Sequence, residues 1–192
     1  MSITKSFLSL LMVLVAVWAV VAEEKKDAPS GPQMVKYQIT GLFSPDREQD
    51  LRTACESLID VRLVSIDYPN AEATFEYDPA KVFPGAKPEQ IVERLDHLVR
   101  QACNSTFSVK PLRTIEKEKL KFVEIPVVGL DCKACSFAAY QTVAKIKGVE
   151  IATASFREGK VTAWINPEQT NVGELEEALK KREVTLGKRE DK

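Results

Sequence analysis

The stretch Val128-Gly-Leu-Asp-Cys-Lys-Ala-Cys-Ser136 is the most informative part of this chain of 192 residues. It places Cys132 and Cys135 where a predicted β-strand turns into a helix. The N-terminus of a helix offers unpaired backbone N–H groups and the positive end of the helix dipole, and both stabilise a thiolate over a thiol. Two thiolates one helical turn apart predict either a site for a soft metal ion or a readily closed disulfide.

The residues around this stretch alternate between strand and helix patterns. Strands are predicted at 122–128, 149–156 and 160–165, with a short last strand at 183–186. A helix is predicted at 134–147, ending at Gly148, and a second helix is marked by Val172, Leu175 and Leu179. The order is βαββαβ, which is the ferredoxin-like arrangement.

The first half of the chain is a divergent copy of the second. When Gly41 is aligned with Gly129, Pro79 falls on Pro167 without a gap. Few residues are identical, but the chemical character matches along the segment, which indicates a repeat. In the first copy, a second helix is predicted at 88–103, with its inward face formed by Ile91, Leu95, Leu98 and Ala102.

The predicted fold class is α+β, with two tandem ferredoxin-like domains after a signal peptide. Lys5 and the apolar run that follows it are typical of a secretory signal, so we expect a secreted or periplasmic protein. The predicted parts are a signal peptide (1–22), a flexible leader (23–33), a first domain without the two cysteines (34–111), a charged linker (112–119), a second domain with them (120–187) and a tail (188–192).

The motif from Gly129 to Cys135, the helix spacing after it and the pair Gly148-Val149 resemble the heavy-metal-associated (HMA) domain family. This family includes copper chaperones and the periplasmic mercuric-ion binding protein. The resemblance implies that Cys132 and Cys135 bind Cu(I) or another soft ion such as Hg(II) or Zn(II), without an organic cofactor, and pass it on by ligand exchange. The family usually has Met where this chain has Leu130, and Thr or Ser where it has Asp131.

Three charged residues are predicted to support the site. Asp131 either adds negative charge beside the metal or caps the helix. Lys133 either lowers the pKa of the thiols or is an ordinary exposed lysine. Lys181, at the end of the last helix, is expected on the same end of the fold, where its charge would offset that of a metal bis-thiolate or simply suit the helix dipole.

The first copy has no cysteine in the corresponding loop, where Ser44 and Arg47 take the two positions. Ser44 before a proline predicts a helix N-cap. Cys55 falls on the core face of its helix and is expected to be an inert buried thiol. Trp164 alternates with inward residues of its strand, which predicts either a contact with the other copy or with a partner, or an isolated exposed aromatic.

The chain carries 27 basic and 28 acidic residues, so no global field attracts nucleic acid or anionic lipid. No phosphate-binding glycine loop or catalytic set is apparent, so an enzyme is not expected. The sequence therefore predicts an exported soft-metal binding or trafficking protein, whose partners are the ion and a donor or acceptor protein. Two alternatives stay open: a thiol–disulfide oxidoreductase, and a scaffold for protein interactions.

Overall fold

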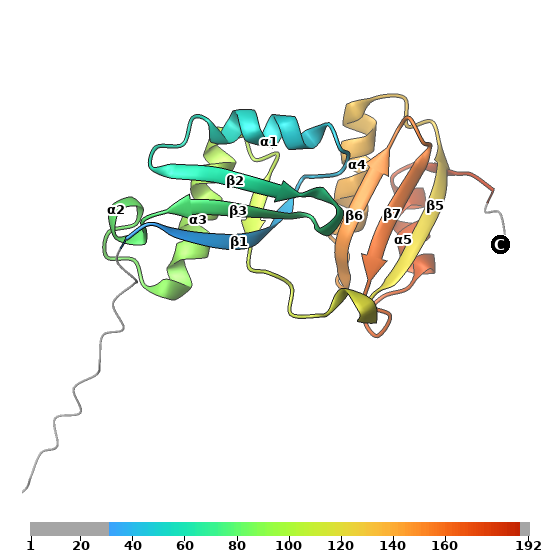
Figure 1. Cartoon of the computed structure of the whole chain (residues 1–192). Coiled ribbons are helices and arrows are strands. Elements are labelled where there is room, and N and C mark those ends of the chain that lie inside the picture. Colours follow the sequence, from blue (N-terminus) through green and yellow to red (C-terminus); the bar gives the residue numbers. More distant parts are fainter. Residues whose placement is uncertain (1–30, 189–192) are drawn as a thin grey trace, which may run out of the picture.

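A computed structural model describes residues 31–188 of the chain (Figure 1). The predicted signal peptide, most of the leader and the last four residues of the tail lie outside this range. The described residues form an α+β structure with two four-stranded sheets, one after the other along the chain. Within residues 31–188, no helix has the length and apolar character needed to cross a membrane.

The N-terminal module, Gln33–Lys110, contains the first sheet. Its strands pair in the order β2-β3-β1-β4, and all neighbouring strands are antiparallel. In chain order its elements are β1 (Gln33–Thr40), α1 (Arg47–Cys55), β2 (Val61–Asp67), the 3₁₀ turn η1 (Tyr68–Asn70), β3 (Glu72–Tyr77), α2 (Pro79–Val82), α3 (Pro88–Ala102) and β4 (Ser108–Lys110).

The C-terminal module, Lys121–Leu186, repeats this arrangement with the strand order β6-β7-β5-β8. Its elements are β5 (Lys121–Val128), α4 (Lys133–Ala144), β6 (Val149–Ser155), β7 (Lys160–Ile165), α5 (Val172–Lys181) and β8 (Thr185–Leu186). The 3₁₀ turn η2 (Lys117–Lys119) precedes it in the linker. The predicted fold of two tandem ferredoxin-like units is confirmed.

Alternating burial along the strands explains why each sheet has one covered face. In β5, Val123, Ile125 and Val127 are buried, while Phe122, Glu124 and Val128 are exposed. Successive side chains of a strand point to opposite faces, so one face of the sheet carries the apolar residues. Helices α4 and α5 cover that face, and their buried residues recur at helical spacing: Ala139, Tyr140, Val143, Leu175 and Leu179.

Two predictions in the N-terminal module are wrong in detail. The fully buried residue in the last turns of α3 is Val99, whereas Leu98 only packs partly against the core. Ser44 is not the N-cap of α1, because the helix begins at Arg47 with Asp46 as its N-cap. The Ser44 hydroxyl instead donates a hydrogen bond to the Asp46 carboxylate at 2.6 Å.

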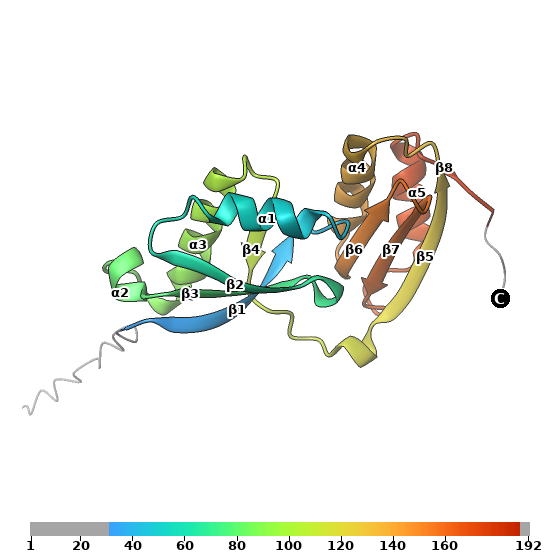
Figure 2. The same cartoon turned by 45° about the horizontal axis from the view of Figure 1, so that its top comes forward.

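The two modules meet through the loop between β1 and α1. Figures 1 and 2 show α1 beginning beside α4 and β6 of the C-terminal module. Phe43, in this loop, is only 3% exposed and belongs to the hydrophobic core of the C-terminal module. The Gly41 N–H also donates to the Tyr140 hydroxyl at 2.7 Å, and the Gln38 side chain donates to the Glu150 carbonyl at 2.6 Å. The first module is therefore docked on the second along α4 and β6.

Candidate metal centre

The loop that carries the two cysteines runs from the end of β5 to the start of α4. Gly129 takes a φ of +82°, a left-handed conformation that glycine adopts without strain, and lets the chain turn. Leu130 is 6% exposed and anchors the loop in the core. Asp131 and Cys132, which follow, are exposed, so the strand-to-helix junction presents the motif to solvent.

Cys132 is the N-cap of α4. Its sulfur accepts a hydrogen bond from the Cys135 N–H at 3.2 Å, as a capping side chain does. The interpretation of Asp131 as the helix cap is therefore wrong, because the sulfur takes this role. Asp131 remains an exposed carboxylate next to the first cysteine.

The two sulfur atoms lie 2.7 Å apart, and both cysteines are free thiols. Cys132 is exposed and Cys135 is half-buried. The hydrogen bond between the side chains lowers the pKa of Cys132 below the usual thiol range, and the backbone N–H of Cys135 adds to this effect. The same side-chain bond raises the pKa of Cys135. Cys132 is thus the sulfur that ionises first.

The charge of Lys133 is paired with a carboxylate of the other module. Its Nζ lies 2.5 Å from an Asp46 carboxylate oxygen, in a salt bridge between the two modules. The hydrogen bond from Lys133 is the main cause that lowers the pKa of Asp46. Neither Asp46 nor Phe43 is predicted from the sequence to lie near the cysteine motif. The one signal was that Phe43, an apolar residue in a loop, takes the repeat position of the exposed Asp131.

In the described part of the chain, no contact connects the two other predicted site residues, Lys181 and Trp164, to the sulfurs. Lys181 is the exposed last residue of α5, and no contact ties it to the sulfurs. Its supporting role stays a prediction. Trp164 is half-buried; its ring lies 5.1 Å from that of Phe122, and Lys117 Nζ lies 4.9 Å from its ring centre. Trp164 therefore contacts Phe122 of its own module and Lys117 of the linker. A contact with a separate partner stays a prediction.

The remaining cysteines and the histidine are not part of this centre. Cys55 and Cys103 are buried in the N-terminal module, as expected for Cys55, and burial raises the pKa of Cys55 to about 12. His97 is exposed on α3. Within residues 31–188, no three His, Cys, Asp or Glu side chains are grouped so as to hold a metal ion. The candidate centre therefore consists of the two sulfurs of Cys132 and Cys135.

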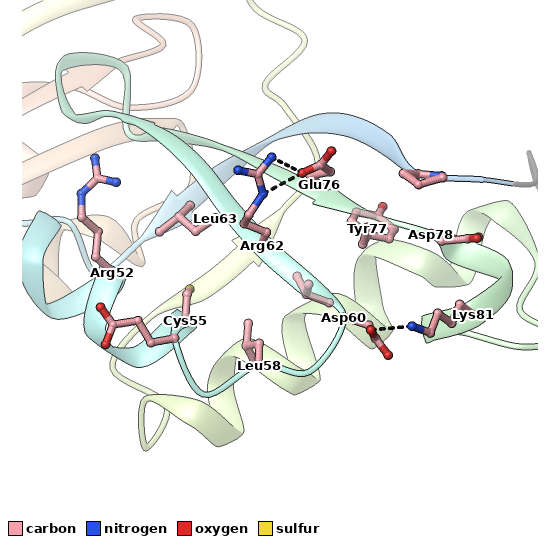
Figure 3. Close-up of a pocket in the computed structure, with 13 residues that line it drawn as sticks. Arg52, Cys55, Leu58, Asp60, Arg62, Leu63, Glu76, Tyr77, Asp78 and Lys81 are labelled. Atoms are coloured by element: carbon pink, nitrogen blue, oxygen red, sulfur yellow. Dashed lines mark hydrogen bonds and ion pairs between the residues drawn. The ribbon is translucent and has the colours of Figure 1, made fainter.

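A groove of about 770 Å³ lies elsewhere, in the N-terminal module (Figure 3). It runs along β2 and the start of α2, and Cys55 is among its lining residues. Four of its charged side chains pair with one another: Arg62 with Glu76, and Lys81 with Asp60 at 2.7 Å. The exposed thiol pair lies in the other module, so this groove is not part of the candidate centre.

Comparison with known proteins gives matches among solved structures only. No protein-family model matches the chain, and no curated protein does. Oxidised MerP from Ralstonia metallidurans CH34 is 20% identical, with a TM-score of 0.34, over 35% of this chain and 94% of that chain. The N-terminal soluble domains of Bacillus subtilis CopA are 19% identical, with a TM-score of 0.33, over 83% of this chain and 95% of that chain.

A third match is the N-terminal domain of a potential copper-translocating P-type ATPase from Bacillus subtilis, solved in its Cu(I)-loaded state. It is 31% identical, with a TM-score of 0.34, over 35% of this chain and 84% of that chain. The strand orders of the two modules carry the fold assignment independently of these scores. The strand orders show that the chain contains two ferredoxin-like units in tandem.

Proposed function

We propose that the chain is an exported, non-enzymatic protein that binds one soft metal ion between Cys132 and Cys135. The observation that carries the proposal is the pair of free sulfurs at the start of α4, one of them exposed and with a lowered pKa. Thiolates are the ligands that Cu(I), Hg(II) and Zn(II) prefer. The exposed position of Cys132 also suits ligand exchange with a donor or acceptor protein.

The sulfurs must separate to hold an ion. With metal–sulfur bonds of about 2.3 Å, a tetrahedral angle at the metal needs sulfurs about 3.8 Å apart, and a linear arrangement about 4.6 Å. The present separation is 2.7 Å. Cys132 is exposed and lies at the cap, outside the regular turns of α4, so rotation of its side chain supplies this change without moving the helix.

Metal titration of the reduced protein under anaerobic conditions tests the proposal. We expect one Cu(I) or Hg(II) per chain, detected by intact-protein mass spectrometry and by competition with a chelator of known affinity. Cys132→Ser should abolish this binding, whereas Cys55→Ala, a change in the core of the other module, should leave it intact. A Cys132→Ser variant that still binds one ion per chain would disprove the proposal.

A second candidate is thiol–disulfide exchange. It is favoured by the hydrogen bond between the two sulfurs and by the opposite pKa shifts that this bond produces. A low-pKa thiolate beside a second thiol is the arrangement of redox cysteine pairs. Insulin reduction that depends on Cys132 would support it, and metal-free protein that leaves insulin oxidised would remove it.

A further inference from the structure

The N-terminal module contributes a charged residue to the surroundings of the thiol pair. Asp46 reaches Lys133, the residue between Cys132 and Ala134, with 2.5 Å between its carboxylate and the lysine Nζ. Its other oxygen accepts a hydrogen bond from the Ser44 hydroxyl at 2.6 Å. Both oxygens of this carboxylate are therefore occupied, one by each module.

The loop that carries Asp46 is fixed in place. Phe43, three residues earlier, is buried in the C-terminal core, and its ring lies 5.5 Å from Phe137 and 5.8 Å from Tyr140. Phe137 and Tyr140 belong to α4, the same helix that begins at Lys133. Because the ring contacts hold the loop against α4, the position of Asp46 relative to the cysteine motif is set by packing and not only by the salt bridge.

The charge of a metal complex at this site depends on the ion. When two protonated thiols bind a monovalent ion such as Cu(I), they release two protons and the charge of the site changes from zero to −1. With a divalent ion such as Hg(II) they release the same two protons and the charge stays at zero. The exposed carboxylate of Asp131 lies next to Cys132 in the chain, and its negative charge disfavours added negative charge at the site. A free Lys133 would favour the anionic complex, but its charge is paired with Asp46.

We propose that Asp46 is a specificity-determining residue that lowers the affinity of the Cys132–Cys135 pair for monovalent relative to divalent soft ions. It acts through Lys133, whose positive charge it pairs with, and it adds its own negative charge to that of Asp131. The inference rests on the proposed metal-binding function. Asp46 is a positioning residue here, since it does not itself touch the ion.

The test compares Cu(I) and Hg(II) affinities of the reduced full chain and its variants by chelator competition. Asp46→Asn should tighten Cu(I) binding about two- to fivefold, the range that an exposed ion pair supplies, and leave Hg(II) binding unchanged. In a Lys133→Met background the same substitution should have a much smaller effect on Cu(I). Asp60→Asn, which removes an equally exposed Asp–Lys pair of the N-terminal module, is the matched control and should change neither affinity.

Salt distinguishes a charge effect from a structural one. Raising potassium nitrate from 0.05 M to 1 M should shrink the Cu(I) gain of Asp46→Asn, because the Debye length falls to about 3 Å, whereas a repacked interface would keep its effect. Equal effects on Cu(I) and Hg(II), or an unchanged Cu(I) affinity in Asp46→Asn, would overturn this inference while metal binding by the wild type still stands. A wild-type chain that binds neither ion overturns both proposals.

Discussion

The backbone carbonyl of Phe43 accepts a hydrogen bond from the N–H of Ala154 at 2.9 Å, so a loop of the N-terminal module pairs with β6 of the C-terminal module. β6 is an edge strand of its sheet, and an unpaired edge is a template for association with other chains. The loop covers part of this edge, and the Phe43 ring fills the adjoining core. The segment that corresponds to the cysteine motif thus serves as an anchor between modules.

Replacing Phe43 by alanine should destabilise the C-terminal module, although the residue belongs to the other one. Removal of a buried phenylalanine ring costs about 3–5 kcal/mol. We expect a loss in this range in urea unfolding followed by the fluorescence of Trp164, which lies in β7. In the chain from Glu23 on, Trp164 is the one tryptophan, so the signal reports on this module.

Phe122→Ala is the control for this change, since it removes the same ring from a position that is 48% exposed. It should cost well under half as much as Phe43→Ala. An equal cost for the two substitutions would contradict the assignment of Phe43 to the C-terminal core.

The glycines Gly41 and Gly129 occupy equivalent repeat positions but should respond differently to alanine. Both have positive φ, +97° and +82°. A Cβ on Gly41 would lie 2.2 Å from the Thr106 carbonyl oxygen and 2.9 Å from the Phe107 ring, whereas nothing lies within 4 Å of one on Gly129. We expect Gly41→Ala to cost about 1–3 kcal/mol more in unfolding free energy than Gly129→Ala. Similar costs would show that the Gly41 turn is not confined by its neighbours.

The fold was predictable because each element of the C-terminal module has an unambiguous period. Alternation in β7 and the three- and four-residue spacing of Val172, Leu175 and Leu179 leave little choice of register. In α3, by contrast, Leu98 and Val99 both continue the apolar stripe from Leu95, so the sequence could not decide which one is fully buried. Tertiary packing decides it in favour of Val99.

The candidate centre was only half predictable. The two cysteines were evident from their spacing, but the partner of Lys133 lies 87 positions away, in a module whose docking no local pattern indicates. The N-cap of α4 was also not predictable, because Asp is a common N-cap whereas cysteine is not among the preferred capping residues. The structure gives this role to the Cys132 sulfur.

Alkylation should distinguish the thiols of Cys132 and Cys135. The thiolate is the reactive form, and the pKa of Cys132 is lowered while that of Cys135 is raised. Iodoacetamide should therefore modify Cys132 first, and the reaction should slow only as the pH falls through this lowered pKa, below the range of an ordinary thiol. Peptide mass spectrometry after short pulses at several pH values measures this order. Faster labelling of Cys135 would contradict the opposite pKa shifts of the two thiols.

Mild oxidation should close a bridge between Cys132 and Cys135 and prevent metal uptake. Their sulfurs lie 2.7 Å apart and Cys132 is exposed to an oxidant, whereas Cys55 and Cys103 are buried thiols of the other module. Metal binding requires reduced, deprotonated ligands. We expect non-reducing peptide mapping to find the Cys132–Cys135 bridge first and Cu(I) binding to return with reductant. Oxidised protein that binds Cu(I) as well as reduced protein would place the ion elsewhere.

The buried thiol of Cys55 should make the N-terminal module less stable at alkaline pH. Burial raises the pKa of Cys55 to about 12, whereas an unfolded thiol ionises near pH 8.5. Above this pH the unfolded chain loses the proton and the native chain keeps it, so the free energy of unfolding falls as the pH rises, by about 1.6 kcal/mol from this group between pH 8.5 and 10. The effect is absent well below the unfolded pKa.

Urea unfolding between pH 8.5 and 10 should therefore show a shallower pH slope for Cys55→Ala than for the wild type. Cys132→Ser is the control that keeps the Cys55 contribution. Parallel slopes in wild type and Cys55→Ala would mean that the thiol ionises equally in both states and is not shielded by Leu51 and the rest of the core.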